Sequence, residues 1–116
     1  GVYTVRKPKI DYERLMAIRA LTPVALVIHG GSGIPEEMLQ RSYRLPGGGV
    51  SKVNIATDLE LAYRQALGLD HYLTNAELEG LADAEKLCAQ QAVEALVSDK
   101  ISHFVLSAGH DMDFNR

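Results

Sequence analysis

The chain has 116 residues, of which 47% are hydrophobic and 23% are charged, and its formal net charge is −3. This length and composition are typical of one soluble globular domain. The small negative charge argues against binding to nucleic acid or an anionic membrane, because either surface would need clustered lysines and arginines. No apolar run approaches the roughly 20 residues that cross a bilayer. We therefore expect a cytoplasmic protein, with its single cysteine, Cys88, as a buried thiol.

The first predicted elements are a helix over residues 12–21 and a strand over residues 24–28. Asp11 can cap the helix, and Pro23 follows its end. The apolar face of this helix is predicted to consist of Leu15, Ile18 and Leu21 or Ala17. The run 24–28 is apolar without alternation, which is typical of a parallel strand that is buried on both faces.

A second strand and helix repeat this order further along the chain. Residues 35–45 predict a helix, because a proline and two glutamates occupy its first turn. Residues 50–56 then predict a strand, and residues 59–67 predict a helix that Thr57 or Asp58 can cap.

The remainder of the chain predicts a polar connection followed by one long C-terminal helix. The apolar residues at helical spacing are Val93, Leu96, Val97, Ile101, Phe104 and Val105. The alternation of helices and strands predicts an α/β fold with a parallel sheet. Two parallel strands alone leave their faces and edges uncovered. We therefore expect residues 1–116 to be a fragment of a larger barrel or sheet.

The chemistry-bearing residues follow the two predicted strands, in the segments 29–33 and 54–58. Ligands of parallel α/β folds lie beyond the carboxyl ends of the strands, and phosphate sites of TIM barrels follow the last two. His29 is a candidate metal ligand or catalyst there. The glycines after it let backbone N–H groups approach an anion. Asn54 and Thr57 can donate hydrogen bonds to a phosphate or a substrate hydroxyl.

Each of these residues also has a purely structural interpretation. His29 could be a hydrogen-bonded histidine without a ligand, and the glycines could form a tight turn. Asn54 could satisfy buried backbone groups, and Asp58 could cap a helix. The functional interpretation is favoured because both segments fall at the same end of the predicted sheet.

Two stretches resemble a known family. Val-Ile-His-Gly-Gly-Ser-Gly-Ile-Pro over residues 27–35, followed by Ser-Lys-Val-Asn-Ile-Ala-Thr-Asp over residues 51–58, closely resembles the class II, zinc-dependent fructose-bisphosphate or ketose-bisphosphate aldolases. The opening, with Gly1-Val2-Tyr3 and residues 8–15, resembles the segment that follows a zinc-binding histidine in this family. The resemblance implies a TIM (β/α)8 barrel, of which this chain would supply strands seven and eight and the C-terminal helices.

The resemblance also implies a set of site residues and cofactors. His29 would be one of three histidine ligands of Zn²⁺, with the other two in the absent N-terminal part of the barrel. A monovalent cation would lie near the same loops, held by backbone carbonyls. The residues that would bind the dihydroxyacetone phosphate moiety are Gly1, Gly30, Gly31, Ser32, Asn54, Ile55, Ala56 and Thr57.

In this family zinc polarises the ketone while a carboxylate removes a proton. That carboxylate has no match here, so we expect no catalytic acid or base in this chain and no activity of the chain alone. The implied reaction is the glycolytic cleavage of fructose 1,6-bisphosphate into dihydroxyacetone phosphate and glyceraldehyde 3-phosphate, in a homo-oligomer.

Alternatives remain open for the substrate and for the mechanism. The glycine-rich loop over residues 45–49 is longer than the usual turn of the family, so tagatose bisphosphate stays a rival substrate. A non-catalytic segment that binds phosphate or another chain is a further alternative. A Schiff base at Lys52 would indicate a metal-free aldolase, which the histidine and the glycine loop disfavour. The remaining histidines, His71, His103 and His110, are expected at the surface.

Overall fold

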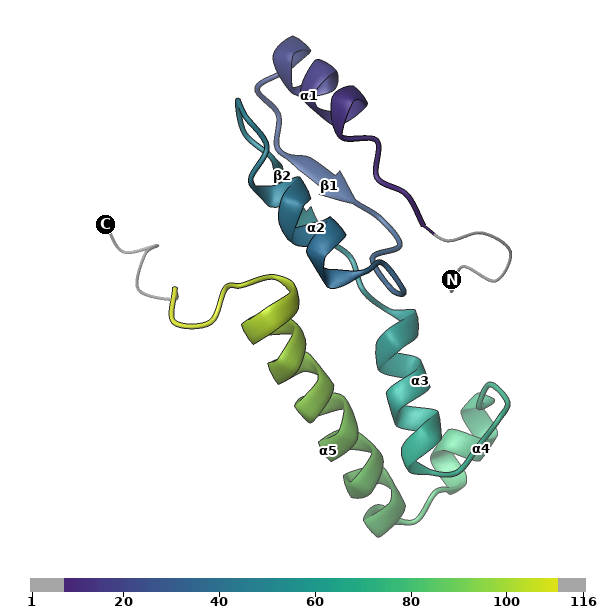
Figure 1. Cartoon of the computed structure of the whole chain (residues 1–116). Helices are drawn as coiled ribbons and strands as arrows, with labels where there is room; N and C mark the ends of the chain where they lie inside the picture. The colour runs from purple at the N-terminus through teal and green to yellow at the C-terminus, as the bar shows by residue number, and fades with distance from the viewer. Residues whose placement is uncertain (1–7, 111–116) are drawn as a thin grey trace.

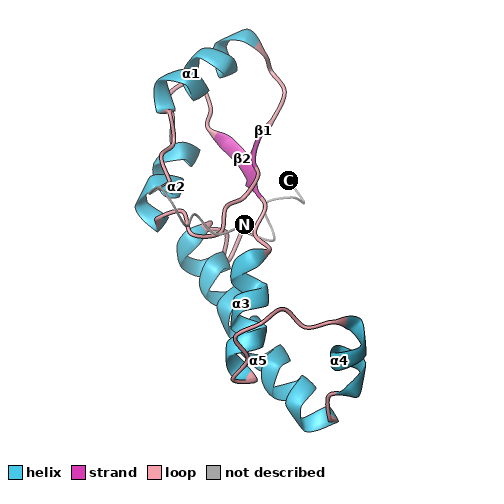
Figure 2. Ribbon diagram, turned by 90° about the vertical axis from the view of Figure 1, so that its right-hand side faces the viewer, coloured by secondary structure: helices cyan, strands magenta, loops and turns pink. Residues whose placement is uncertain are grey.

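The computed structural model describes residues 8–110, which form a small sheet with nearby helices and a helical arm that extends away from it (Figure 1). Figure 2 shows the same division from the side, with both strands in one part and α3, α4 and α5 in the other. The elements in chain order are α1 (Tyr12–Leu21), β1 (Leu26–Ile28), α2 (Glu36–Tyr43), β2 (Val50–Val53), α3 (Thr57–Ala66), α4 (Asn75–Gly80), α5 (Asp83–Asp99) and the π-helix η1 (Lys100–Phe104).

Helix α1 spans the predicted residues because Asp11 caps it. A carboxylate oxygen of Asp11 accepts a hydrogen bond from the backbone N–H of Arg14 at 2.9 Å. The predicted apolar face is not buried in the described part of the chain, where Leu21 is 87% exposed. A polar contact instead ties α1 to α2, since the Tyr12 hydroxyl donates to the carbonyl of Met38 at 3.0 Å.

The sheet is parallel, as predicted, and consists of β1 and β2. Leu26 lies opposite Val50 and Ile28 lies opposite Val53, with a shift of register directly after Leu26. Both strands are shorter than the predicted ranges, 24–28 and 50–56. The predicted burial on both faces is not observed within residues 8–110, because Val27 is 41% exposed. Two strands cannot cover both of their own faces.

The core lies between the sheet, α2 and η1. Leu39 of α2 is fully buried, and Ile34 and Phe104 pack with it. Side chains from both strands, Ile28 and Val53, lie against this cluster. Since α2 follows β1 and returns to the start of β2, the core fixes the two strand ends relative to each other.

The helical arm consists of α3 packed along α5, with α4 at the far end (Figures 1 and 2). Helix α3 begins at Thr57, and its N-cap residue is Ala56, which provides no side-chain hydrogen bond. The prediction that Thr57 or Asp58 caps this helix is therefore wrong. Among the described residues, no helix is long and apolar enough to cross a membrane.

Three further features differ from the sequence-based expectations. Helix α4 lies in the predicted polar connection and begins with a capping box between Thr74 and Glu77. The predicted long C-terminal helix is present, but its last turn is not α-helical, because α5 ends at Asp99 and continues directly into the π-helix η1. Cys88 is exposed, so its prediction as a buried thiol is wrong. The arm packs as a two-helix hairpin, which leaves the outer side of α5 to solvent.

Candidate active site

The segments that follow β1 and β2 are held side by side by backbone hydrogen bonds. Asn54 donates its N–H to the carbonyl of Ile28 at 2.9 Å, and its carbonyl accepts from the N–H of Gly31 at 2.8 Å. These bonds continue the parallel ladder past the last strand residues. Both predicted motifs therefore meet at the carboxyl edge of the sheet.

The side chains of His29 and Asn54 are in direct contact at this edge. Asn54 Nδ2 lies 3.1 Å from His29 Nδ1 and donates to it in this orientation, whereas a flipped amide would place Oδ1 there to accept from Nδ1–H. The amide of asparagine can serve either tautomer, since it carries a donor and an acceptor. When Nδ1–H donates to Asn54 Oδ1, the other ring nitrogen, Nε2, is unprotonated and can coordinate a metal.

The glycines after His29 have distinct structural roles. Gly30 and Gly33 adopt positive φ angles of 71° and 75°, a conformation that favours glycine. A Cβ on Gly31 would lie 2.3 Å from Val53 Cγ2 and 3.0 Å from the Asn54 carbonyl. The missing side chain at Gly31 therefore lets the glycine loop pack closely against the end of β2. The N–H of Gly31 already donates a hydrogen bond to the Asn54 carbonyl.

Ser32 connects the glycine loop to the helix after the second strand. Its side chain is buried, and Oγ accepts a hydrogen bond from the N–H of Asp58 at 3.1 Å. Because Ala56 provides no cap, Ser32 satisfies a first-turn N–H of α3 across the sheet edge. The hydroxyl keeps its own proton for a further acceptor.

The segment 54–57 curves around the same edge before α3 begins. Ile55 packs against the core, Ala56 is exposed and Thr57 is half-buried. The amino end of α3, with its partial positive charge, consequently lies at the carboxyl edge of the sheet, next to the glycine loop. Gly1, the remaining predicted phosphate contact, lies outside the described residues.

The model of the family described as fructose-bisphosphate aldolase class-II matches residues 1–110. The chain belongs to the class II fructose-bisphosphate aldolase family. The match confirms the resemblance inferred from the two motifs. The family implies a TIM barrel, and a two-stranded parallel sheet with α-helices is consistent with part of one. It also implies a lyase of carbohydrate metabolism.

Class II aldolases are generally zinc-dependent, so we ask whether the residues fit a metal. His29 suits one coordination position, because its imidazole is exposed and oriented by Asn54. Across residues 8–110, no group of three or more histidine, cysteine, aspartate or glutamate side chains could hold an ion. A zinc site needs at least three protein ligands. Residues 8–110 of this aldolase chain therefore contain no complete zinc site, and the assignment of His29 as a ligand stays a prediction.

The other histidines lie at the surface, as predicted. His71 Nε2 lies 3.2 Å from Glu77, and His103 Nδ1 lies 2.9 Å from Asp99. His110 is exposed as well. All three are remote in sequence from the strand ends. His71, in the loop before α4, pairs with Glu77 of α4, and His103 of η1 pairs with Asp99 at the end of α5.

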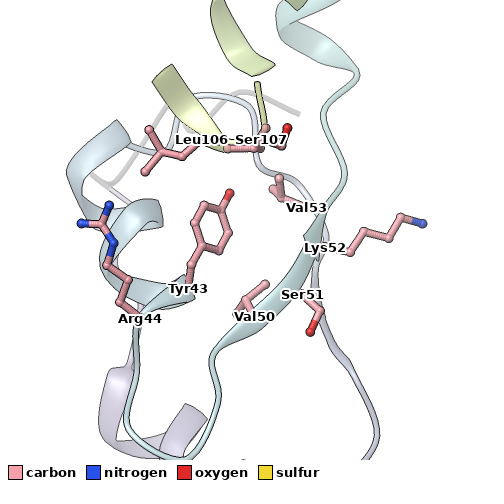
Figure 3. A pocket seen from close by; sticks show the side chains of 9 residues that line it. Tyr43, Arg44, Val50, Ser51, Lys52, Val53, Leu106 and Ser107 are labelled. Atoms are coloured by element: carbon pink, nitrogen blue, oxygen red, sulfur yellow. The ribbon is translucent and has the colours of Figure 1, made fainter. Parts of the chain in front are cut away.

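A groove of about 560 Å³ lies elsewhere, between Tyr43, β2 and residues 105–107 (Figure 3). The Tyr43 hydroxyl is buried and has no hydrogen-bond partner within the described part of the aldolase chain. Burial raises the pKa of Tyr43 to about 12. Figure 3 shows Lys52 directed away from Tyr43, on the opposite side of β2. Sequence reasoning missed this groove, and Lys52 is the one residue weighed from the sequence as a reactive group that lines it.

Proposed function

We propose that this chain contributes one zinc ligand and the phosphate-binding loops to a class II aldolase that cleaves fructose 1,6-bisphosphate. The products would be dihydroxyacetone phosphate and glyceraldehyde 3-phosphate, and the reverse condensation would use the same site. We also propose that β1 and β2 are the last two strands of a TIM barrel, in a cytoplasmic homo-oligomer.

The observation that carries this proposal is the contact between His29 and Asn54. These residues belong to different βα units, and their side chains meet at 3.1 Å beyond the carboxyl ends of two paired parallel strands. This edge is where α/β barrels place their active sites. The family match covers both motifs.

The proposed roles follow from the local geometry. His29 would bind Zn²⁺, with Asn54 fixing the orientation of its ring. Bound zinc would supply a Lewis acid that polarises the substrate ketone. Gly30 and the hydroxyl proton of Ser32 would face the phosphate, which the amino end of α3 attracts. The Gly31 N–H already donates to the Asn54 carbonyl, so it would bind the phosphate as a donor shared between two acceptors.

We also propose that the segment 54–57 binds the substrate phosphate, together with Gly1, whose role is implied by the family resemblance alone. Backbone groups of Ile55, Ala56 and Thr57 lie at the start of α3, where N–H groups have no intrahelical partner. The predicted monovalent cation would be held by backbone carbonyls of these loops. No proton-transfer carboxylate is assigned to this chain.

The test is an aldolase assay on the complete protein with its metal content measured. We expect cleavage of fructose 1,6-bisphosphate that is lost on chelation and restored by Zn²⁺. His29→Ala should remove at least one ligand and lower kcat by more than about 100-fold, with reduced zinc content. His103→Ala is the matched control, since His103 is exposed on η1, and it should leave both quantities unchanged. Full activity after metal removal would contradict the zinc mechanism.

The same assay separates the alternatives. A higher kcat/KM for tagatose 1,6-bisphosphate than for the fructose isomer would assign the protein to the rival substrate. Binding of phosphate without cleavage of either sugar would instead indicate a non-catalytic binding role for these loops.

A further inference from the structure

A nearly buried ion pair lies directly behind the proposed phosphate site. Lys100 Nζ is 2.8 Å from Asp58 Oδ2, and the two side chains are only 19% and 18% exposed. No other ion pair found within residues 8–110 has both partners so well covered. The pair joins α3 to η1, two elements that α4 and α5 separate along the chain.

Both partners are fixed by further contacts. The backbone N–H of Asp58 donates to Ser32 Oγ, so this residue touches the glycine loop and carries the ion pair at once. The Lys100 ammonium group lies 4.1 Å from the centre of the Phe104 ring, and Phe104 is buried in the core. On the other side of η1, Gln40 of α2 donates to the carbonyl of His103 at 2.7 Å.

The position of Asp58 creates an electrostatic conflict. Asp58 lies in the first turn of α3, where a carboxylate interacts favourably with the helix dipole. A substrate phosphate at the same helix end would experience that carboxylate as a neighbouring like charge. The conflict is removed if a cation neutralises Asp58, and Lys100 is the cation in contact with it.

We propose that Lys100 is a positioning residue for substrate binding, which neutralises Asp58 and so keeps the amino end of α3 available to the phosphate of the substrate. This inference rests on the proposed function, since it takes the phosphate site at segment 54–57 as given. Lys100 does not touch the substrate in this scheme. Its effect reaches the phosphate through Asp58, Ser32 and the first turn of α3.

A charge role and a purely structural role make different predictions for a double-mutant cycle. Lys100→Met keeps an unbranched apolar stem against Phe104 but leaves Asp58 without a counter-charge. Asp58→Asn keeps the shape of the side chain and the backbone N–H bond to Ser32 while removing the charge. If charge is what matters, the second substitution should repair the first.

The cycle is measured on the complete, zinc-loaded protein, with KM for fructose 1,6-bisphosphate and the inhibition constant of inorganic phosphate as readouts. We expect Lys100→Met to raise both constants by about tenfold, equivalent to about 1.4 kcal/mol, with kcat and zinc content within about twofold of wild type. Asp58→Asn alone should leave them unchanged or lower. The Lys100→Met/Asp58→Asn double variant and Lys100→Arg should both return to within about twofold of wild type.

The opposite results overturn the inference in distinct ways. A double variant that binds phosphate as weakly as Lys100→Met, or an Asp58→Asn variant that weakens binding to the same extent, would show that the pair acts only as a structural clamp. Equal constants for all four variants would show that the pair does not influence the site. A wild-type protein that neither cleaves the sugar nor binds phosphate would refute the proposed function and this inference together, whereas an active wild type isolates the inference.

Discussion

Substitution of Gly31 by alanine tests how the two halves of the site are joined. The added Cβ would lie 2.3 Å from Val53 Cγ2, whereas carbon atoms in good contact are about 3.5–4.0 Å apart. The glycine loop must therefore move away from β2 by roughly 1 Å or more. That displacement weakens the bond from Gly31 N–H to the Asn54 carbonyl. Overpacking together with the lost hydrogen bond should lower the free energy of unfolding by about 2–4 kcal/mol.

The measurement is urea-induced unfolding of the complete protein, combined with kcat/KM for the sugar bisphosphate. A misplacement of about 1 Å can lower catalysis by roughly 100-fold, so we expect a loss of this order in Gly31→Ala. Gly80→Ala is the control, because a Cβ at Gly80 meets open space, and it should change stability by less than about 0.5 kcal/mol. A Gly31→Ala protein as stable and active as this control would refute the close approach of the loop to β2.

Three further substitutions test the core, the groove and α4. Leu39→Ala removes a fully buried side chain and should lower the free energy of unfolding by about 2–5 kcal/mol in a denaturant titration; a loss below about 1 kcal/mol would show that the core is not packed around this residue. Tyr43→Phe removes a buried hydroxyl that has no hydrogen-bond partner among residues 8–110 and should raise stability by about 1 kcal/mol at neutral pH. Because the folded-state pKa of Tyr43 is raised to about 12, stability should fall as pH rises from 10 towards 12 in wild type and fall less in the variant. Thr74 lowers the pKa of Glu77 to about 2 through hydrogen bonds, so this carboxylate stabilises the fold above pH 4.5 and loses that effect as pH falls towards 2. Glu77→Gln removes the titrating group and should flatten this acid-side dependence in thermal melts, and an unchanged profile would contradict the capping box.

The elements that sequence predicts best are those fixed by local chemistry. Asp11 and the turn after Leu21 delimit α1 because capping depends on a few neighbouring residues. An uninterrupted apolar run identified the first strand and a β-rich segment the second, and the meeting of His29 with Asn54 followed from the rule that parallel strands end at one edge.

Other features depend on contacts between distant residues and could not be predicted in this way. Ser32 accepts from Asp58 across the sheet edge, which no local pattern indicates. The last helical turn, η1, is a π-helix that carries Phe104 of the core, whereas the apolar spacing alone favoured a regular α-helix. Helix α4 is a different case: the spacing of Thr74 and Glu77 matches a capping box, so this signal was present in the sequence.

The contact between His29 and Asn54 spans 25 residues of chain. Neither βα unit can form it alone, because the histidine is in the first and the asparagine is in the second. Closing a loop of this length costs entropy, which only the pairing of β1 with β2 and the packing of α2 can offset. The orientation of the imidazole is thus a property of the completed strand pair, and a folding intermediate with only one unit formed would hold His29 without its orienting partner.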